Sequence, residues 1–271
     1  GGTLSLMGTN TYGGTTTIQG GSTLNTISFG STSSLIFSSG GGKIELGSAA
    51  TTTATLNISA PATIGTNTFN VAISGNISGG SPLNKIGLGV LTLTGTNTSA
   101  AQITIEGGTL NLTSASLGST TALVFDTFGG TLQAGGALTI TQPVTLTTQG
   151  TIDTNGSNVT ISNTITGPGD LGKSGTGTLT ISSAGNNYTG LTFIENGTLN
   201  ALSTSLPMTA TSQLVFSGTG GTPIFQAGGA FPAFTNSVVL MNNGTIDTNG
   251  SAVTISGIVA GLSSYSLTKI G

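Results

Sequence analysis

The chain lacks several residue types on which most enzyme and metal sites depend. Among its 271 residues there is no cysteine, no histidine and no tryptophan, and only 4% of residues are charged. Without cysteine there is no disulfide framework, thiol chemistry or thiolate metal site. Without histidine, neither a Ser-His-Asp triad nor a histidine zinc site can form. We therefore expect no cofactor and no metal, and most catalytic constellations are excluded.

Positive charge is equally scarce. The basic residues are all lysines, namely Lys43, Lys85, Lys173 and Lys269, and the formal net charge is −3. Nucleic acids and anionic membrane surfaces bind to basic patches, so we expect neither as a partner. The sequence also has no run of about 18 apolar residues, and we expect no membrane insertion by this segment.

The abundant residues indicate strands and turns. Glycine accounts for 46 of the 271 residues, and the mean hydropathy of +0.30 is too high for a disordered chain. Apolar and polar residues alternate in short runs, such as 91–93, 103–105 and 109–112, that are followed by Gly, Asn or Ser. This is the period of a strand with one buried face, and no stretch has helical spacing. We expect an all-β chain with almost no helix.

The sequence repeats itself. The block that starts at Lys85 recurs at Lys173, 88 residues later, and its first three residues recur at Lys269, 96 residues after that. Such a period favours stacked coils over a sandwich or a closed barrel. We expect one β-solenoid over 1–271, with about four coils of 20 to 24 residues in each repeat, cut from a longer array. The expected repeat units are 1–87, 88–175 and 176–271.

Two further elements recur. Segment 151–162 returns as 245–256, with Asp153 and Asp247 in equivalent positions. An Asx-type turn, in which Asp accepts backbone N–H groups, explains this pattern better than a calcium loop, because the closing Glu of such a loop is missing. A second turn recurs around three asparagines, for which we expect a turn or an amide contact between coils, with sugar contact as the alternative. These asparagines are Asn10, Asn97 and Asn186.

These elements together resemble a known family. A Gly-x-Gly-x-Leu-Thr-Leu strand, then Gly-x-Asn-x-Tyr-x-Gly, then x-Thr-x-Ile-x-x-Gly-Thr-Leu is similar to the autotransporter-associated β-strand repeat. The best copy runs from Gly175 to Leu199. The resemblance implies a right-handed parallel β-helix in the passenger domain of a bacterial type V secreted protein, displayed outside the cell. It also implies adhesion, aggregation or coat roles more often than catalysis.

Carboxylates are the remaining candidates for catalysis. We expect Asp153 and Asp247 to lie about four coils apart, near 19 Å, whereas glycosidase carboxylates are about 5 to 10 Å apart. Two other features concern the surface. Lys43 and Glu45, two apart on one strand, are expected to form a weak surface ion pair. Tyr12 and Tyr188 offer stacking faces for carbohydrate, but they lie too far apart to form one platform.

These observations predict a non-enzymatic structural repeat module of a secreted or cell-surface bacterial fibre or autotransporter passenger, serving as an extended shaft or coat. Its expected partners are further copies of the same repeat, in the same chain or end to end. Two alternatives stay open: an adhesin that binds a host receptor or a cell-surface glycan, and a β-helical enzyme that degrades polysaccharide. The expected location is extracellular, either secreted or associated with the outer membrane.

Overall fold

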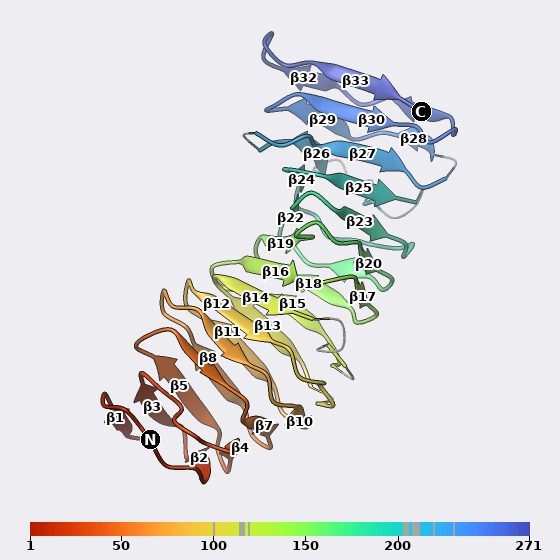
Figure 1. Cartoon of the computed structure of the whole chain (residues 1–271). Coiled ribbons are helices and arrows are strands. Elements are labelled where there is room, and N and C mark those ends of the chain that lie inside the picture. Colours follow the sequence, from red (N-terminus) through yellow and green to blue (C-terminus); the bar gives the residue numbers. More distant parts are fainter. Residues whose placement is uncertain are drawn as a thin grey trace. The chain divides into compact units, whose positions relative to one another are not determined.

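The computed structural model describes residues 1–99, 101–113, 117–118, 120–202, 206–207, 212–218, 220–229 and 231–271. The chain divides into two compact units, Gly1–Leu132 and Gln133–Gly271. In the described residues every regular element is a β-strand and there is no helix, which confirms the all-β prediction (Figure 1).

The strands of the first unit are three to five residues long and contain the alternating runs predicted from the sequence. They are β1 (Thr3–Leu6), β2 (Thr15–Gln19), β3 (Ser22–Thr26), β4 (Ser34–Ser38), β5 (Gly42–Leu46), β6 (Ala50–Thr52), β7 (Thr55–Ile58), β8 (Ala62–Gly65), β9 (Val71–Ile73), β10 (Ile77–Gly79), β11 (Leu83–Ile86), β12 (Val90–Leu93), β13 (Ile103–Glu106), β14 (Thr109–Leu112) and β15 (Leu123–Phe125).

The second unit is built in the same way, and β16 (Gly130–Ala134) spans the division between the units. Its strands are β17 (Leu138–Ile140), β18 (Val144–Leu146), β19 (Gly150–Asp153), β20 (Val159–Ile161), β21 (Ile165–Thr166), β22 (Leu171–Ser174), β23 (Thr178–Ile181), β24 (Thr192–Ile194), β25 (Thr198–Ala201), β26 (Gln213–Phe216), β27 (Ile224–Ala227), β28 (Phe231–Phe234), β29 (Ser237–Leu240), β30 (Gly244–Asp247), β31 (Val253–Ile255), β32 (Val259–Gly261) and β33 (Leu267–Ile270).

In the first unit the chain visits three parallel sheets in turn. The strand orders are β1-β3-β5-β8-β11-β13-β15, β10-β7-β4-β2 and β14-β12-β9-β6. Consecutive strands β8, β9 and β10 lie in different sheets, and β11 then returns to pair with β8 in parallel. A chain that returns to the same sheet after each circuit forms a coil, so this unit is a β-solenoid.

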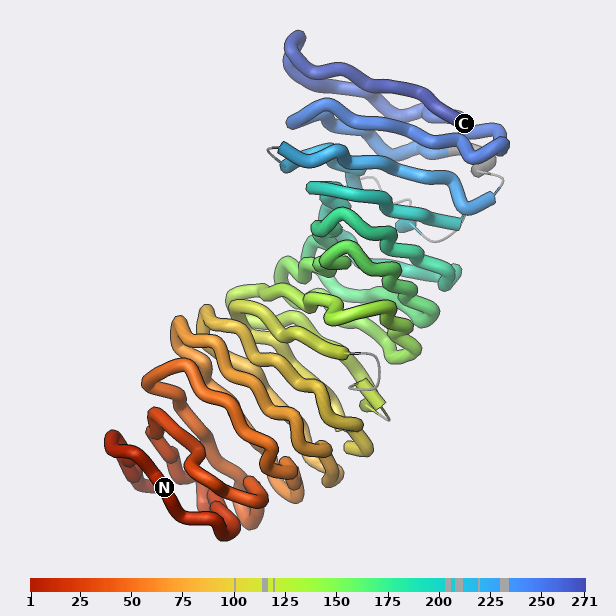
Figure 2. The backbone as a smooth tube through the Cα atoms, viewed as in Figure 1, coloured from red at the N-terminus to blue at the C-terminus, as the bar shows by residue number. Residues whose placement is uncertain are grey.

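The second unit follows the same rule. Its larger sheets have the orders β32-β29-β26-β24-β22-β19 and β17-β20-β23-β25-β27-β30-β33, with β18 beside β21 and β28 beside β31. Figure 2 shows the backbone of each unit as successive coils. Together the two units contain about 12 turns.

Coil length is set by the in-register stacking of buried residues. In the first unit Ile44, Ile64, Lys85, Ile105 and Phe125 are successive partners across β5, β8, β11, β13 and β15. Most cross-coil contacts join residues about 20 apart, within the predicted range, but Asn200 and Gln226 are 26 apart, so that coil has more residues. Insertions at coil corners leave the stacked strands undisturbed, as expected for a solenoid.

Apolar side chains fill the interior, as predicted. Every strand with a Leu-x-Leu or Val-x-Ile pattern in the middle of a unit points its apolar residues inward; Leu91, Leu93, Val159 and Ile161 are all below 2% exposed. Burial of one such side chain stabilises the fold by roughly 1.5–3 kcal/mol. The outward positions between them are Thr, Ser and Asn, with Ala72 as an exception in β9, and they cover the sheets.

Equivalent positions of successive repeats do not lie in the same sheet. After β19, which contains Asp153, the chain returns to that sheet at β22, β24, β26 and β29, and Asp247 follows on β30 in the neighbouring sheet. The repeat therefore exceeds a whole number of coils by one sheet. The expected separation of about four coils took the repeat as a whole number of coils, whereas the sheet orders place Asp153 and Asp247 in neighbouring sheets.

Candidate functional site: buried lysine cages

The side chain of Lys85 is completely buried and points into the solenoid. Its Nζ donates to Thr66 Oγ1 at 3.0 Å in the preceding coil and to Gly107 O at 3.0 Å in the following coil. It also donates to Ile86 O at 3.3 Å and Gly87 O at 2.5 Å in its own coil. One ammonium group thus connects three consecutive coils, and we call this arrangement the lysine cage.

Lys173 has the same cage in the second unit. It is also completely buried, and its Nζ donates to Thr154 Oγ1 at 3.1 Å in the preceding coil. Its other acceptors are Ser174 O at 2.8 Å, Gly175 O at 2.7 Å and, in the following coil, Asn196 O at 2.8 Å. The two repeats therefore reproduce the cage acceptor by acceptor.

The turn that follows each cage threonine shapes the cage. Asn67 has a left-handed backbone, with φ of 49°, and its Nδ2 donates to Leu46 O at 2.7 Å in the preceding coil. Gly87, with φ of 83°, passes so close to this turn that an added Cβ would lie 2.5 Å from Asn67 N. Asn155 and Gly175 repeat this geometry, with the same 2.5 Å approach. The glycine after each cage lysine is thus required by close packing.

Burial lowers the pKa of both cage lysines. Burial lowers the pKa of Lys85 from its ordinary value of 10.5 to about 8. The pKa of Lys173 is also lowered to about 8 by burial, and the carboxylates of Asp153 and Glu195 oppose this change. An ammonium group has three donors, and four acceptor oxygens surround each one, so these buried charges are hydrogen-bonded.

The third lysine of the series is placed differently. Lys269 is exposed, and its Nζ donates to Gly271 O. Thr248 Oγ1 donates to Ile270 O at 3.3 Å, as Thr66 does to Ile86 O and Thr154 to Ser174 O. The threonine, the turn and the glycine of the cage are therefore present in the third copy as well.

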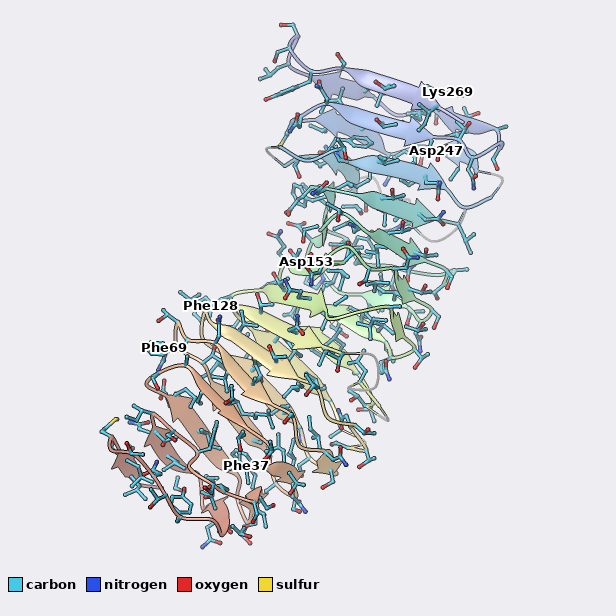
Figure 3. All side chains as sticks on the ribbon, in the orientation of Figure 1. Phe37, Phe69, Phe128, Asp153, Asp247 and Lys269 are labelled. Carbon is cyan, nitrogen blue, oxygen red and sulfur yellow. The ribbon has the colours of Figure 1, made fainter. Side chains whose placement is uncertain are left out.

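Asp153 and Asp247, labelled in Figure 3, are the last residues of β19 and β30 and begin these turns. Asp153 Oδ1 accepts Asn155 N at 2.8 Å, and Asp247 Oδ1 accepts Asn249 N at 2.9 Å, which confirms the predicted Asx-type turns. Their second oxygens accept an amide from the preceding coil: Gln133 donates to Asp153 and Gln226 to Asp247, each at 2.8 Å.

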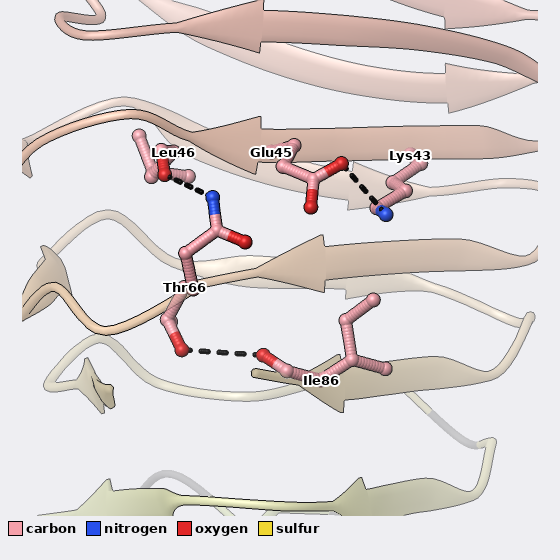
Figure 4. Close-up of polar contacts among 6 residues, drawn as sticks. Lys43, Glu45, Leu46, Thr66 and Ile86 are labelled. Carbon is pink, nitrogen blue, oxygen red and sulfur yellow. Dashed lines mark hydrogen bonds and ion pairs between the residues drawn. The ribbon is translucent and has the colours of Figure 1, made fainter. Parts of the chain in front are cut away.

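The first repeat has an ion pair in place of this amide contact. Gly65 occupies the aspartate position, and Glu45, its partner in β5, occupies the glutamine position. Glu45 pairs with Lys43 at 2.7 Å, as predicted, with both side chains about 30% exposed (Figure 4). The exterior of the cage thus varies between repeats, whereas its interior does not.

The recurrent asparagines make contacts between coils. Asn10 Nδ2 donates to Ser28 O at 2.7 Å, Asn97 Nδ2 to Thr120 Oγ1 at 3.3 Å, and Asn186 Oδ1 accepts Ile165 N at 2.7 Å. The partners are 18 to 23 residues apart, about one coil. This geometry matches the amide contact that the sequence suggested, and Asn97 and Asn186 are too buried to contact a sugar.

The tyrosines do not form a carbohydrate surface. Tyr188 is completely buried, and its hydroxyl pairs with Thr192 Oγ1 at 2.6 Å. Tyr12 makes the same contact with Thr16 Oγ1 at 3.0 Å but is 39% exposed. The stacking face considered for Tyr188 was wrong because this ring belongs to the core.

The repeated lysines are visible in the sequence, but their contact with a threonine of the preceding coil is not. The signal was a fixed separation, since Lys85 lies 19 residues after Thr66 and Lys173 lies 19 after Thr154, about one coil. In the part of the chain that the structure describes, no three acidic, histidine or cysteine side chains gather in a way that could hold a metal ion. The described residues also include no helix that could cross a membrane.

Comparison with known proteins finds a known repeat family in three segments of the chain. Residues 1–25, 83–112 and 171–201 match the passenger-associated-transport-repeat family. The second and third matches begin with the strands that carry Lys85 and Lys173. No solved structure matches the chain.

One similar curated protein is the adhesin BmaC autotransporter of Brucella suis biovar 1 (strain 1330). It is 32% identical over 234 residues, which cover 76% of this chain and 7% of that protein. The chain thus spans about 7% of the length of this relative. The resemblance noted in the sequence is confirmed: three segments of the chain match a passenger-associated transport repeat, and the chain is similar to an autotransporter adhesin.

Proposed function

We propose that this chain is a non-enzymatic structural module, a shaft segment of a secreted or cell-surface bacterial passenger. The observation that carries the proposal is the lysine cage. Lys85 and Lys173 are basic residues that could serve a ligand, yet each is buried and hydrogen-bonded to three consecutive coils. The same repeat places Asp153 and Asp247 in turn contacts. The repeated chemistry of the chain therefore serves its own stacking.

The proposal extends to the architecture. The coil is right-handed, as the family resemblance implies, and 1–271 is a single solenoid of three repeat units in a longer array. Each repeat unit contains about four coils and a further third of a coil, which moves equivalent residues to the next sheet. The partners are further copies of the repeat, stacked in the same chain or end to end, because exposed solenoid ends require a covering coil or cap.

The rival function is adhesion, and the name of the Brucella relative favours it. In that case receptor or glycan contacts belong to residues that differ between repeats. A polysaccharide-degrading enzyme is less well supported, since Asp153 and Asp247 lie in different sheets and are engaged in turns.

A glycan array together with a polysaccharide-turnover screen tests the proposal. We expect neither saturable binding nor turnover by the chain. Saturable binding to one glycan class would contradict a purely structural role and support the adhesin. Release of reducing ends from any polysaccharide would reject both in favour of an enzyme.

A further inference from the structure

The corner of the first unit outside the Lys85 cage exposes two large apolar side chains. Leu88 is 75% and Phe128 is 85% exposed, and a groove of about 350 Å³ between them is lined by Ile86, Gly87, Glu106 and Gly107. The geometry points to a docking site for an arginine side chain of a partner protein. This goes beyond the shaft function, which needs no such surface.

The groove arises from the stacking of three turns. The turn at Leu88 and the turn at Phe128 flank a middle turn made of Gly107 and Gly108, which have no side chains. Backbone hydrogen bonds fix this stack: Thr109 N donates to Gly89 O at 3.2 Å, and Thr131 N donates to Gly108 O at 2.9 Å. Because the middle turn is bare, the two apolar side chains become the walls of an open groove.

The wall at Phe128 is held in an unusual conformation. The preceding Thr127 is β-branched but has a left-handed backbone, with φ of 55°, which is a costly conformation. Its backbone N donates to Asp126 Oδ1 at 2.7 Å, and its hydroxyl donates to Glu106 Oε2 at 3.4 Å. The turn thus presents Phe128 to solvent and, at the same time, orients the Glu106 carboxylate along the groove.

Charge complementarity identifies the occupant. Glu106 lines the groove and Asp126 holds the turn before Phe128, whereas Lys85 is enclosed in its cage and Lys43 is paired with Glu45. Arginine has an aliphatic stem for Leu88, a planar cation for the face of Phe128, and a forked donor for Glu106. A neutral sugar would satisfy the aromatic wall but would leave the acidic charge without a counterpart.

The second unit provides a natural contrast. Thr176 occupies the position of Leu88, Ser174 that of Ile86, and Asn196 places a side chain where the first unit has Gly107. The backbone of the cage is the same in both units, so the groove depends on side chains that the fold does not require. The variant Leu88→Thr therefore removes one wall with a residue that this turn already accommodates.

Titration followed by NMR tests the site in the whole chain, with N-acetyl-arginine amide as probe. We expect saturable shift changes at residues 87–89, 106–108 and 127–129, with half-saturation at about millimolar concentration, as suits so small a ligand. The matched probe is N-acetyl-citrulline amide, which has nearly the same shape without the charge, and it should bind at least about tenfold more weakly.

Three variants complete the experiment. Phe128→Ser, Glu106→Gln and Leu88→Thr should each weaken arginine binding severalfold, and added salt should weaken it as well. Equal binding of citrulline, or shifts that persist in Phe128→Ser and Glu106→Gln, would overturn the proposal. Saturation of these resonances by a neutral saccharide, with none by arginine, would overturn it in favour of a glycan site. A glycan site would also contradict the purely structural role, whereas the other outcomes leave the shaft function untouched.

Discussion

The cages of the first and second units can be compared group by group. Inside, Lys85 and Lys173 donate to the same four kinds of acceptor, and both are closed by an asparagine turn and a glycine. Outside, the first unit has Gly65 and the Lys43–Glu45 ion pair, whereas the second has the Gln133–Asp153 hydrogen bond. The repeat thus preserves the lysine hydrogen bonds that connect the coils. The residues on the surface around them differ between repeats.

The physical reason is the difference in solvation. A buried ammonium group and buried carbonyls cannot turn to water, so the loss of one partner leaves the others unsatisfied. An exposed ion pair is little more stable than its two hydrated charges. An exposed hydrogen bond can therefore be replaced by an ion pair or by water. The interior is therefore specified by chemistry, whereas the exterior can acquire features such as Leu88 and Phe128 at little cost.

The largest effect should come from the cage lysines. Lys85→Met and Lys173→Met keep most of the side-chain volume but leave several carbonyls without a donor, and each should lower the free energy of unfolding by about 3–5 kcal/mol. Urea unfolding followed by circular dichroism measures this. The control Lys43→Met breaks only the surface pair and should cost less than about 1 kcal/mol. Equal effects at Lys43 and Lys173 would erase the contrast between interior and exterior.

The lowered pKa of Lys85 and Lys173 should also make the free energy of unfolding depend on pH. In the folded state their pKa is about 8, against 10.5 in the unfolded chain, so between these values the unfolded state binds more protons. The free energy of unfolding should therefore rise as the pH increases from 8 towards 10. Burial raises the pKa of Tyr188 above 10, so above pH 10 the ionised tyrosine of the unfolded chain should reduce stability.

Unfolding by urea at pH 7 to 11 measures this profile. In Lys173→Met the rise between pH 8 and 10 should be smaller, and in Tyr188→Phe the fall above pH 10 should be weaker. A stability that declines steadily from pH 8 in the unsubstituted chain would contradict the burial of the two lysines.

The cage threonines should have the next largest effect. Thr66→Val and Thr154→Val keep the shape of the side chain and remove one acceptor from a buried ammonium, which should cost about 1–3 kcal/mol. Thr63→Val, at an outward position of β8 three residues before Thr66, is the control and should stay within about 0.5 kcal/mol. If Thr63→Val and Thr66→Val change the stability equally, the Thr66 hydroxyl does not help to hold the coils together.

The smallest effect is expected when one exterior is converted into the other. Gly65→Asp combined with Glu45→Gln gives the first unit the amide contact of the second. An added Cβ at Gly65 would lie 3.4 Å from Lys43 Cε, the end of a flexible side chain, so the change should stay below about 1 kcal/mol. A loss above about 2 kcal/mol would show that the exterior is constrained after all.

Much of the fold could be predicted from the sequence. Alternation in runs such as 91–93 indicates a strand with one buried face, and the recurrence of Lys85 at Lys173 indicates stacked coils. The location of the lysines could not be predicted, because a lysine on a short strand normally faces water. Only the separation of 19 residues between threonine and lysine, about one coil, carries that information.

The change of sheet from Asp153 to Asp247 was also beyond the sequence. Coil lengths vary at the corners, from about 20 residues to 26 at Gln226, and the number of coils in a repeat cannot be derived from the period alone. For the same reason a surface feature such as the Leu88–Phe128 groove needs the structure, since only the stacked turns bring these residues to one corner.

The ammonium protons of lysine provide the most direct test of the central claim, that the repeated lysines tie coils together from the inside. Side-chain 15N–1H NMR spectra near pH 6 observe the Nζ protons of a lysine when they exchange slowly with water. The account predicts two protected signals, which disappear one at a time in Lys85→Met and Lys173→Met, with rapid exchange at Lys43 and Lys269. Rapid exchange of all four ammonium groups would contradict it.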